Sequence, residues 1–190
     1  RLLREAISRV GVLVMMNGIV GANTHRALDV SEFRAFTLID AYAPLIFINA
    51  ADSERGRVFS LLHEFVHIGL GTNSLFNARE GETEFVRPEE TLCNAVAAEV
   101  LVPRRAFCSA WENTAGTVEK RVQELSKYFN CSQSVIARRA LDEAYLTEEQ
   151  YRELIAKATM LAKKARSGGG DYYRTQLSRM DHRFLQALDA

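Results

Sequence analysis

The chain has 190 residues, of which 47% are apolar and 25% charged, enough to bury one sizeable core or a core and a small appended module. Lys and Arg number 24, as do Asp and Glu, so no net charge draws the protein to nucleic acid or to an acidic membrane surface. Three widely spaced cysteines without a C-x-x-C pair argue against a disulfide scaffold and predict a reducing, cytoplasmic setting.

The first fifty residues predict one short helix and three extended segments. Arg1–Arg9 has apolar residues at helical spacing among charges, and the β-rich run Val10–Met16 follows it. Phe33–Ile39 and Pro44–Asn49 are two extended runs with a short polar connection, a pattern typical of a hairpin. We therefore expect a three-stranded sheet, or a hairpin alone, in this part of the chain.

A well-capped helix is predicted after the hairpin. Asp52 or Ser53 is a suitable N-cap, and the apolar spacing continues up to Gly69. The helix carries His63 and His67, which we expect near the edge of its buried face.

More helices are predicted in the rest of the chain. A polar, glycine-containing loop, Thr72–Arg87, leads into a helix over Pro88–Leu101. Four further helices are predicted over Arg104–Glu112, Thr117–Phe129, Ser132–Tyr145 and Thr147–Ala165. The expected fold is α+β, with a core over residues 1–115, a helical subdomain over 116–166, and a glycine linker with a C-terminal helical segment over 167–190.

The histidines form an H-E-x-x-H pattern with Glu64. On a helix, His63 and His67 lie on one face, one turn apart, so that both imidazoles can reach one Zn²⁺. Glu64 then stands beside the open position where a water binds. Two surface histidines would be the simpler explanation, but the motif lies in a strongly apolar, capped helix. The pattern therefore indicates a metal-dependent hydrolase.

A catalytic zinc needs a third protein ligand. The metzincin pattern is excluded, because leucine and asparagine stand where it requires a glycine and a third histidine. Glu89 and Glu90 open the next helix, and either carboxylate could complete the site. Glu90 has Asn94 one turn further on, where an amide could hold a histidine N–H. Cys93 could ligate a metal, or simply be a small buried residue.

The two helices together resemble the ImmA/IrrE family of zinc metallopeptidases. The family pattern is H-E-x-x-H followed by E-x-x-A-N-x-F-A-A-x-L-L-x-P, and the chain matches it over Arg57–His67 and Glu90–Pro103. Cys93, Val96 and Val100 replace residues of the pattern and are all still apolar.

This resemblance implies a small zincin-like core of the gluzincin type with zinc as its cofactor. It implies metal ligands at His63, His67 and Glu90, and Glu64 as the general base. An extended substrate is expected to pair with a sheet edge near Leu45–Ile48. By residue type alone, the candidates for stabilising the oxyanion are Tyr42 and His25.

The resemblance also implies a protein partner. In this family the substrate is typically a helix-turn-helix transcriptional repressor, and some members are encoded with toxins as antitoxin-like partners. Residues 117–145 themselves resemble a helix-turn-helix with Gln133, Ser134 and Arg138 outward, but their charges nearly cancel, so nucleic-acid binding is not expected. Apolar runs too short to cross a bilayer predict no membrane contact. The alternative is a non-catalytic, antitoxin-like or DNA-binding regulator that uses the peptidase fold as a scaffold.

Overall fold

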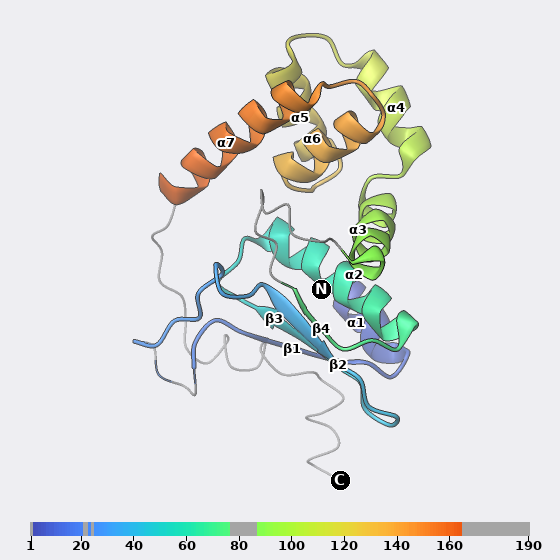
Figure 1. Ribbon diagram of the computed structural model, residues 1–190, viewed down its shortest axis with the longest axis vertical. Helices are drawn as coiled ribbons and strands as arrows, with labels where there is room; N and C mark the ends of the chain where they lie inside the picture. Colours follow the sequence, from blue (N-terminus) through green and yellow to red (C-terminus); the bar gives the residue numbers. More distant parts are fainter. Residues whose placement is uncertain (1, 21–22, 24, 77–86, 165–190) are drawn as a thin grey trace. The chain divides into compact units, whose positions relative to one another are not determined.

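The computed structural model describes residues 2–20, 23, 25–76 and 87–164 (Figure 1). These residues form two compact units, which divide between Val96 and Ala97 inside one helix. The predicted glycine linker and C-terminal helical segment, residues 167–190, lie outside the described residues. Domain boundaries at residues 115 and 166 stay predictions. None of the helices described is both long enough and apolar enough to span a bilayer.

The first unit begins with a helix and a strand. α1 covers Leu2–Arg9 and β1 covers Leu13–Asn17, close to the predicted segments. Val10 and Gly11 form the turn between them, in which Gly11 has a φ of 98°, a value that glycine adopts without steric cost. The strand therefore begins later than predicted, because the turn takes up residues that hydropathy alone assigns to the strand.

The predicted hairpin is confirmed. β2, Ala35–Leu38, pairs antiparallel with β3, Leu45–Asn49. Asp40 shapes the connection, because its carboxylate accepts hydrogen bonds from the backbone N–H groups of Tyr42 and Ala43. β1 pairs in parallel with the other side of β3. β3 is therefore an interior strand.

A fourth strand, β4, covers Ser74–Phe76 and pairs antiparallel with β2, so that the order is β1-β3-β2-β4. The prediction of a three-stranded sheet or a hairpin alone was wrong, because β4 adds a fourth strand. Its three residues stand in a polar stretch too short to show an alternating pattern. The predicted substrate edge near Leu45–Ile48 was also wrong, since β3 is paired on both sides. The edge strands of the described sheet are β1 and β4.

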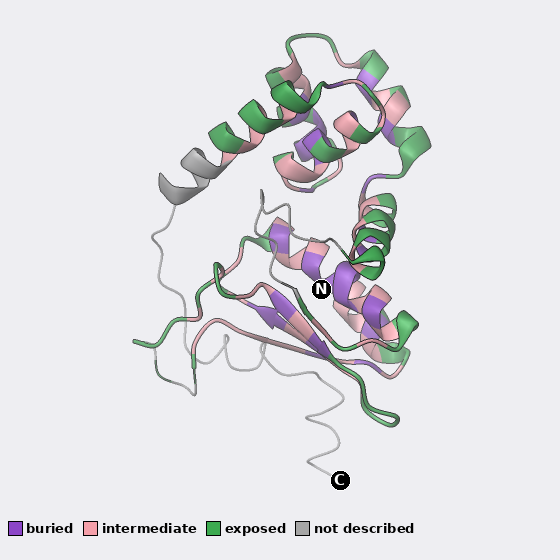
Figure 2. Ribbon diagram, in the orientation of Figure 1, coloured by how far each residue is buried: buried purple, intermediate pink, exposed green. Residues whose placement is uncertain are grey.

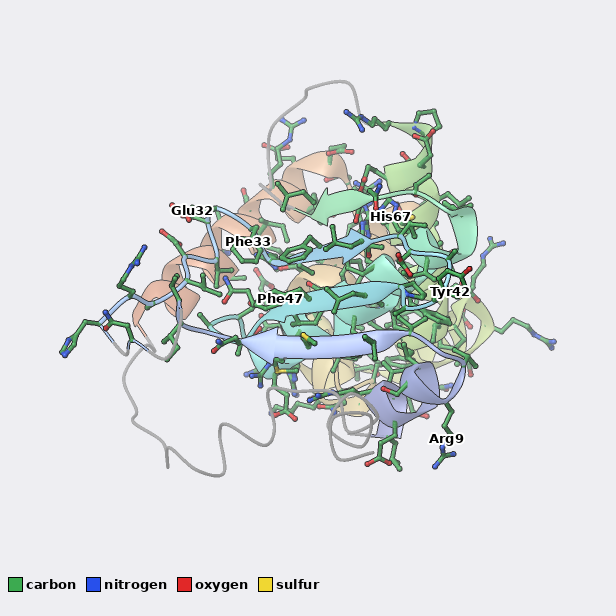
Figure 3. The ribbon with its side chains drawn as sticks, turned by 90° about the horizontal axis from the view of Figure 1, so that it is seen from below. Arg9, Glu32, Phe33, Tyr42, Phe47 and His67 are labelled. Atoms are coloured by element: carbon green, nitrogen blue, oxygen red, sulfur yellow. The ribbon has the colours of Figure 1, made fainter. Side chains whose placement is uncertain are left out.

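One face of the sheet carries the core of the first unit. α1 packs on this face together with α2, Glu54–Leu70 (Figure 2). The buried side chains are Ile7, Val12, Val14, Ala35, Ile46, Ile48 and Leu61. Burial of each large aliphatic side chain contributes roughly 1.5–3 kcal/mol. Strand alternation puts Phe36 and Phe47 on the opposite face, where their rings stack with centroids 5.0 Å apart beside Phe33 (Figure 3).

The second unit is helical, as predicted. After α3, Pro88–Leu101, the described helices are α4, Arg104–Asn113; α5, Val118–Tyr128; α6, Gln133–Asp142; and α7, Glu148–Lys164. Thr117 and Ser132 cap α5 and α6 by accepting backbone N–H groups. Thr147 and Gln150 exchange two hydrogen bonds at the start of α7, and together they form a capping box.

α5 and α6 form the expected two-helix arrangement. Val122, Leu125 and Ile136 are buried in a core that Phe107 and Trp111 of α4 complete. The turn between the helices contains Asn130 with a φ of 50°, a conformation that asparagine tolerates better than most residues. A glycine is therefore not required there. α7 packs against α6.

Candidate metal centre

The helix that carries the H-E-x-x-H pattern has a defined beginning and end. Ser53 is the N-cap, and its hydroxyl accepts a hydrogen bond from the Gly56 N–H at 3.1 Å. Gly71 ends the helix with a φ of 68°, and the following Thr72 N–H donates to the His67 carbonyl at 3.1 Å. This turn brings the Thr72 side chain back toward the last turn of α2.

His63, Glu64 and His67 are more buried than the sequence predicts. The two histidines were expected near the edge of the buried face, yet His63 and Glu64 are fully buried and His67 is 2% exposed. The Nε2 atoms of the histidines lie 3.2 Å apart on consecutive turns of α2. The structure thus brings the two imidazoles to one point inside the first unit.

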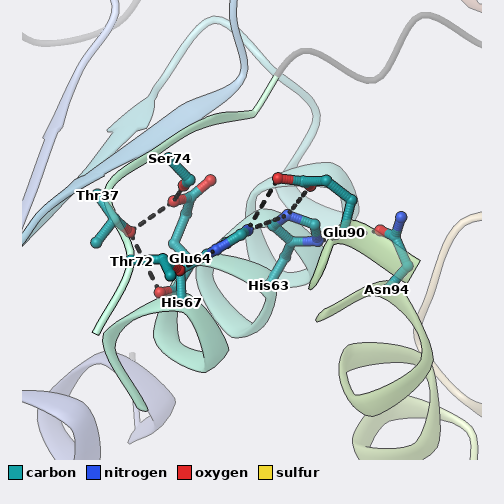
Figure 4. A network of polar contacts seen from close by, with 8 residues as sticks. All are labelled: Thr37, His63, Glu64, His67, Thr72, Ser74, Glu90 and Asn94. Carbon is teal, nitrogen blue, oxygen red and sulfur yellow. Dashed lines mark hydrogen bonds and ion pairs between the residues drawn. The ribbon is translucent and has the colours of Figure 1, made fainter. Parts of the chain in front are cut away.

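The start of α3 adds a carboxylate at the same point (Figure 4). Glu90 Oε2 lies 3.1 Å from His63 Nε2, and its Oε1 lies 3.3 Å from His67 Nε2. Of the two glutamates that open the helix, Glu90 faces the histidines, whereas Glu89 is exposed. The Glu90 side chain is itself 31% exposed, in contrast to the two buried histidines.

Each imidazole has a partner on its other nitrogen. His63 Nδ1 lies 3.0 Å from Asn94 Oδ1. Because an amide oxygen only accepts, Nδ1 carries the hydrogen and Nε2 presents a lone pair. His67 Nδ1 lies 2.9 Å from Thr72 Oγ1. Sequence reasoning singled out Asn94 but missed Thr72, which the turn at Gly71 places there.

Burial keeps His63 neutral. Loss of solvation lowers the pKa of its imidazole to about 4, and the nearby Glu90 carboxylate opposes that effect only in part. At neutral pH the ring therefore carries no charge, which is the form that binds a metal.

Glu64 belongs to the same network, and its carboxylate faces the sheet. Its Oε2 accepts a hydrogen bond from Thr37 Oγ1 at 2.5 Å and another from Ser74 Oγ. Its Oε1 is buried and has no hydrogen-bond partner among the described residues. Burial raises the pKa of this carboxyl, and the two hydroxyl donors oppose the rise. Thr37 and Ser74 were both missed; a hydroxyl at an inward strand position was the available signal for Thr37.

Cys93 is a second candidate for the third ligand. His63, His67 and Cys93 are buried, and one potential ligand atom of each lies within 4.8 Å of the other two, so this group could hold a metal ion. Burial, helped by Glu90 and other nearby carboxylates, raises the pKa of the thiol to about 11. The thiol is therefore protonated near neutrality, whereas the Glu90 oxygens lie 3.1 and 3.3 Å from the Nε2 atoms of His63 and His67.

The spacing of these atoms fits a divalent metal ion. Nitrogen and oxygen ligands about 2.0–2.1 Å from a tetrahedral zinc lie about 3.3 Å from one another. The distances among the two Nε2 atoms and the Glu90 oxygens are 3.1 to 3.3 Å. Lone pairs this close repel one another unless a proton or a cation lies between them. The arrangement could therefore hold a divalent metal ion.

Tyr42 and His25, the oxyanion candidates by residue type, are both exposed. Tyr42 is 94% exposed in the connection between β2 and β3 (Figure 3).

A family model described as the IrrE N-terminal-like domain matches residues 7–141, well over half of the chain. The chain belongs to the ImmA/IrrE metallopeptidase family. No significant match was found among curated proteins or among solved structures. The family match covers β1 to β4 and both helices of the metal centre, and it continues through α5 into α6. The buried histidine pair of this ImmA/IrrE domain is thus a candidate metal-binding group within a peptidase fold.

Proposed function

We propose that this ImmA/IrrE domain is a zinc-dependent endopeptidase of the gluzincin type. His63, His67 and Glu90 would hold the ion, with Asn94 orienting His63 through its Nδ1–H. The observation that carries the proposal is the ligand-like spacing of the two Nε2 atoms and the Glu90 carboxylate. Family membership supports the same chemistry.

Glu64 is the proposed general base. A bound zinc supplies two effects, acidification of a water and polarisation of the scissile carbonyl. Glu64 takes the proton at Oε1, its oxygen without a partner in the described network, and then delivers it to the leaving amine. Its buried surroundings favour this exchange, because a raised pKa makes the carboxylate a better proton acceptor.

We place the substrate along β4. In the described sheet this strand pairs only with β2, so its other edge can accept an extended peptide as an added strand. Leu75 in this strand is 67% exposed, and the neighbouring Ser74 contacts the proposed base. A peptide on this edge therefore lies beside Glu64.

The proposed substrate is a regulatory protein, specifically a helix-turn-helix transcriptional repressor in the cytoplasm. Support comes from the family, in which repressors of this class are typical substrates. The second proposed partner, on the same grounds, is a toxin encoded nearby.

Two measurements test the peptidase function. Purified protein should contain about one zinc per chain, and His63→Ala and His67→Ala should lose it. Co-expression with a helix-turn-helix repressor should give cleavage by the wild type and none by Glu64→Gln, which keeps its zinc. Protein that has no zinc after preparation in zinc-containing buffer would exclude the enzyme function.

The alternative is a non-catalytic, antitoxin-like or DNA-binding regulator. In the second unit, several basic side chains that a phosphate backbone would need are paired with acids: Arg138 with Asp142 at 3.0 Å, and Arg139 with Glu99 at 2.8 Å. Such pairs weaken attraction to DNA. Salt-dependent duplex binding that is lost in Arg138→Ala would favour this alternative.

A further inference from the structure

We propose that Thr37 and Ser74 are positioning residues for Glu64. Their hydroxyl groups hold one carboxylate oxygen, Oε2, so that Oε1 is the atom that exchanges the proton during catalysis. This role rests on the proposed peptidase function and adds two residues, from two strands, to the site.

The sheet places the two hydroxyls side by side. Thr37 of β2 and Ser74 of β4 are direct cross-strand partners, so their side chains leave the sheet on the same face. That face is covered by α2, which carries Glu64 (Figure 4). A carboxylate reaching down from the helix therefore meets two donors at one point.

The hydroxyl groups of Thr37 and Ser74 both donate to the same carboxylate oxygen of Glu64. Thr37 Oγ1 lies 2.5 Å from Glu64 Oε2 and 3.2 Å from the Glu64 carbonyl oxygen, and its one proton serves the shorter contact. Ser74 Oγ donates to the same Oε2. Thr37 is fully buried, so the contact does not compete with bulk water.

The consequence is a distinction between the two carboxylate oxygens. Oε2 uses its lone pairs on the hydroxyls, whereas Oε1 is buried without a partner in the described network. Two donors from separate strands also fix the rotation of the carboxylate about its terminal bond. Catalysis gains from such fixed orientation, because a misplacement of about 1 Å can cost about a hundredfold in rate.

A purely structural role makes a different prediction. If the hydroxyls only satisfied a buried polar group, their loss would lower stability but leave the turnover of the folded, zinc-loaded protein unchanged. A positioning role requires a lower kcat in protein that remains folded and loaded.

The first test uses variants that remove or keep a hydroxyl. Thr37→Val has almost the shape of threonine, and Thr37→Ser restores the donor. With a purified repressor that the wild type cleaves, Thr37→Val should retain about one zinc per chain and a similar KM, while kcat falls about 10–100-fold. Thr37→Ser should recover most of that loss. An equal kcat for wild type and Thr37→Val, or an equal loss in both variants, would overturn the proposal.

Ser74 allows the same comparison at a half-buried position that tolerates substitution better. Ser74→Ala should lower kcat, and Ser74→Thr should restore it. This pair decides the question if Thr37→Val does not fold.

The second test needs no turnover. In metal-free protein, Thr37→Val and Glu64→Leu form a double-mutant cycle for unfolding. Thr37→Val should raise the unfolding equilibrium constant about tenfold or more when Glu64 is present, and much less in the Glu64→Leu background. If Thr37→Val changed the unfolding equilibrium equally in both backgrounds, that result would contradict the positioning role but not the peptidase function. Coupling in the cycle without cleavage of any repressor by the wild type would contradict the peptidase function, and the positioning role with it.

Discussion

Asn94 Oδ1 lies 3.0 Å from His63 Nδ1, one helical turn beyond Glu90 on α3. One helix therefore supplies both the proposed carboxylate ligand and the acceptor that fixes the tautomer of a histidine ligand from another helix. Outer partners of this kind typically change metal affinity about 10–100-fold when they are removed.

We accordingly expect Asn94→Leu to weaken zinc binding by about 10–100-fold, because His63 loses the acceptor that keeps its hydrogen on Nδ1. Competition with a chelator of known affinity measures the change. Asn94→Asp, which retains an acceptor, should keep or increase the affinity. An unchanged affinity in Asn94→Leu would show that the contact does not orient the ligand.

Thr72→Val is the matched variant at the other histidine. Thr72 Oγ1 lies 2.9 Å from His67 Nδ1, so its loss should also weaken zinc binding. Sequence reasoning did not find this residue, and a measurable effect would show that the turn after α2 contributes to the site.

Cobalt substitution distinguishes the two candidate third ligands. With Glu90 as the ligand, the Co²⁺ protein should lack the near-ultraviolet absorption of a sulfur-to-cobalt bond, because thiolate is absent from the ligand set. Glu90→Ala should lose most of the metal affinity, and Cys93→Ala should keep it. A strong sulfur band that disappears in Cys93→Ala would assign Cys93 as the ligand instead.

The metal-free protein should lose stability in acid through His63. The pKa of this imidazole is lowered to about 4 in the folded chain, against a usual value of 6.5. Between these two values the unfolded chain binds more protons than the folded chain, so the stability from this group is present above pH 6.5 and lost as pH falls toward 4. The shift corresponds to roughly 3 kcal/mol of unfolding free energy.

Denaturant unfolding of metal-free wild type and His63→Gln between pH 7 and 4 measures this contribution. The stability difference between the two proteins should shrink as pH falls. Glu64 acts in the opposite direction, because its pKa is raised and its stabilising contribution is lost as pH increases above the unfolded value near 4.5. A difference that does not vary with pH would contradict the lowered pKa of His63.

The two helices of the metal centre could be predicted because their signals are local. Caps, apolar spacing and the four-residue interval between His63 and His67 all lie within single segments. The hairpin was predictable for the same reason. Burial of the histidines was not predictable from their helix alone, since the start of α3 and the sheet complete their surroundings.

The contact between Ser74 and Glu64 could not be predicted, because it depends on a strand with no periodic signal. β4 has three residues, and its pairing with β2 is what puts Ser74 beside Thr37. A strand of this length is specified by its neighbours in space rather than by its own residues. The third ligand was likewise a choice among neighbours on one helix, because the sequence does not show in which direction each side chain points.

The end of α2 offers a matched pair of glycines for a final prediction. Gly71 has a φ of 68°, a conformation that disfavours alanine, whereas Gly69 lies within the helix and a Cβ there would meet no atom within 4 Å. Gly71→Ala should therefore lower the free energy of unfolding by about 1 kcal/mol, and Gly69→Ala should raise it by about 0.5–1 kcal/mol.

Because the turn at Gly71 also places Thr72 on His67, Gly71→Ala should weaken zinc binding as well, while Gly69→Ala should not. Denaturant unfolding of the metal-free proteins and chelator competition give the two quantities separately. Equal zinc affinities in the two variants would mean that the contact between His67 Nδ1 and Thr72 Oγ1 adds nothing to metal binding.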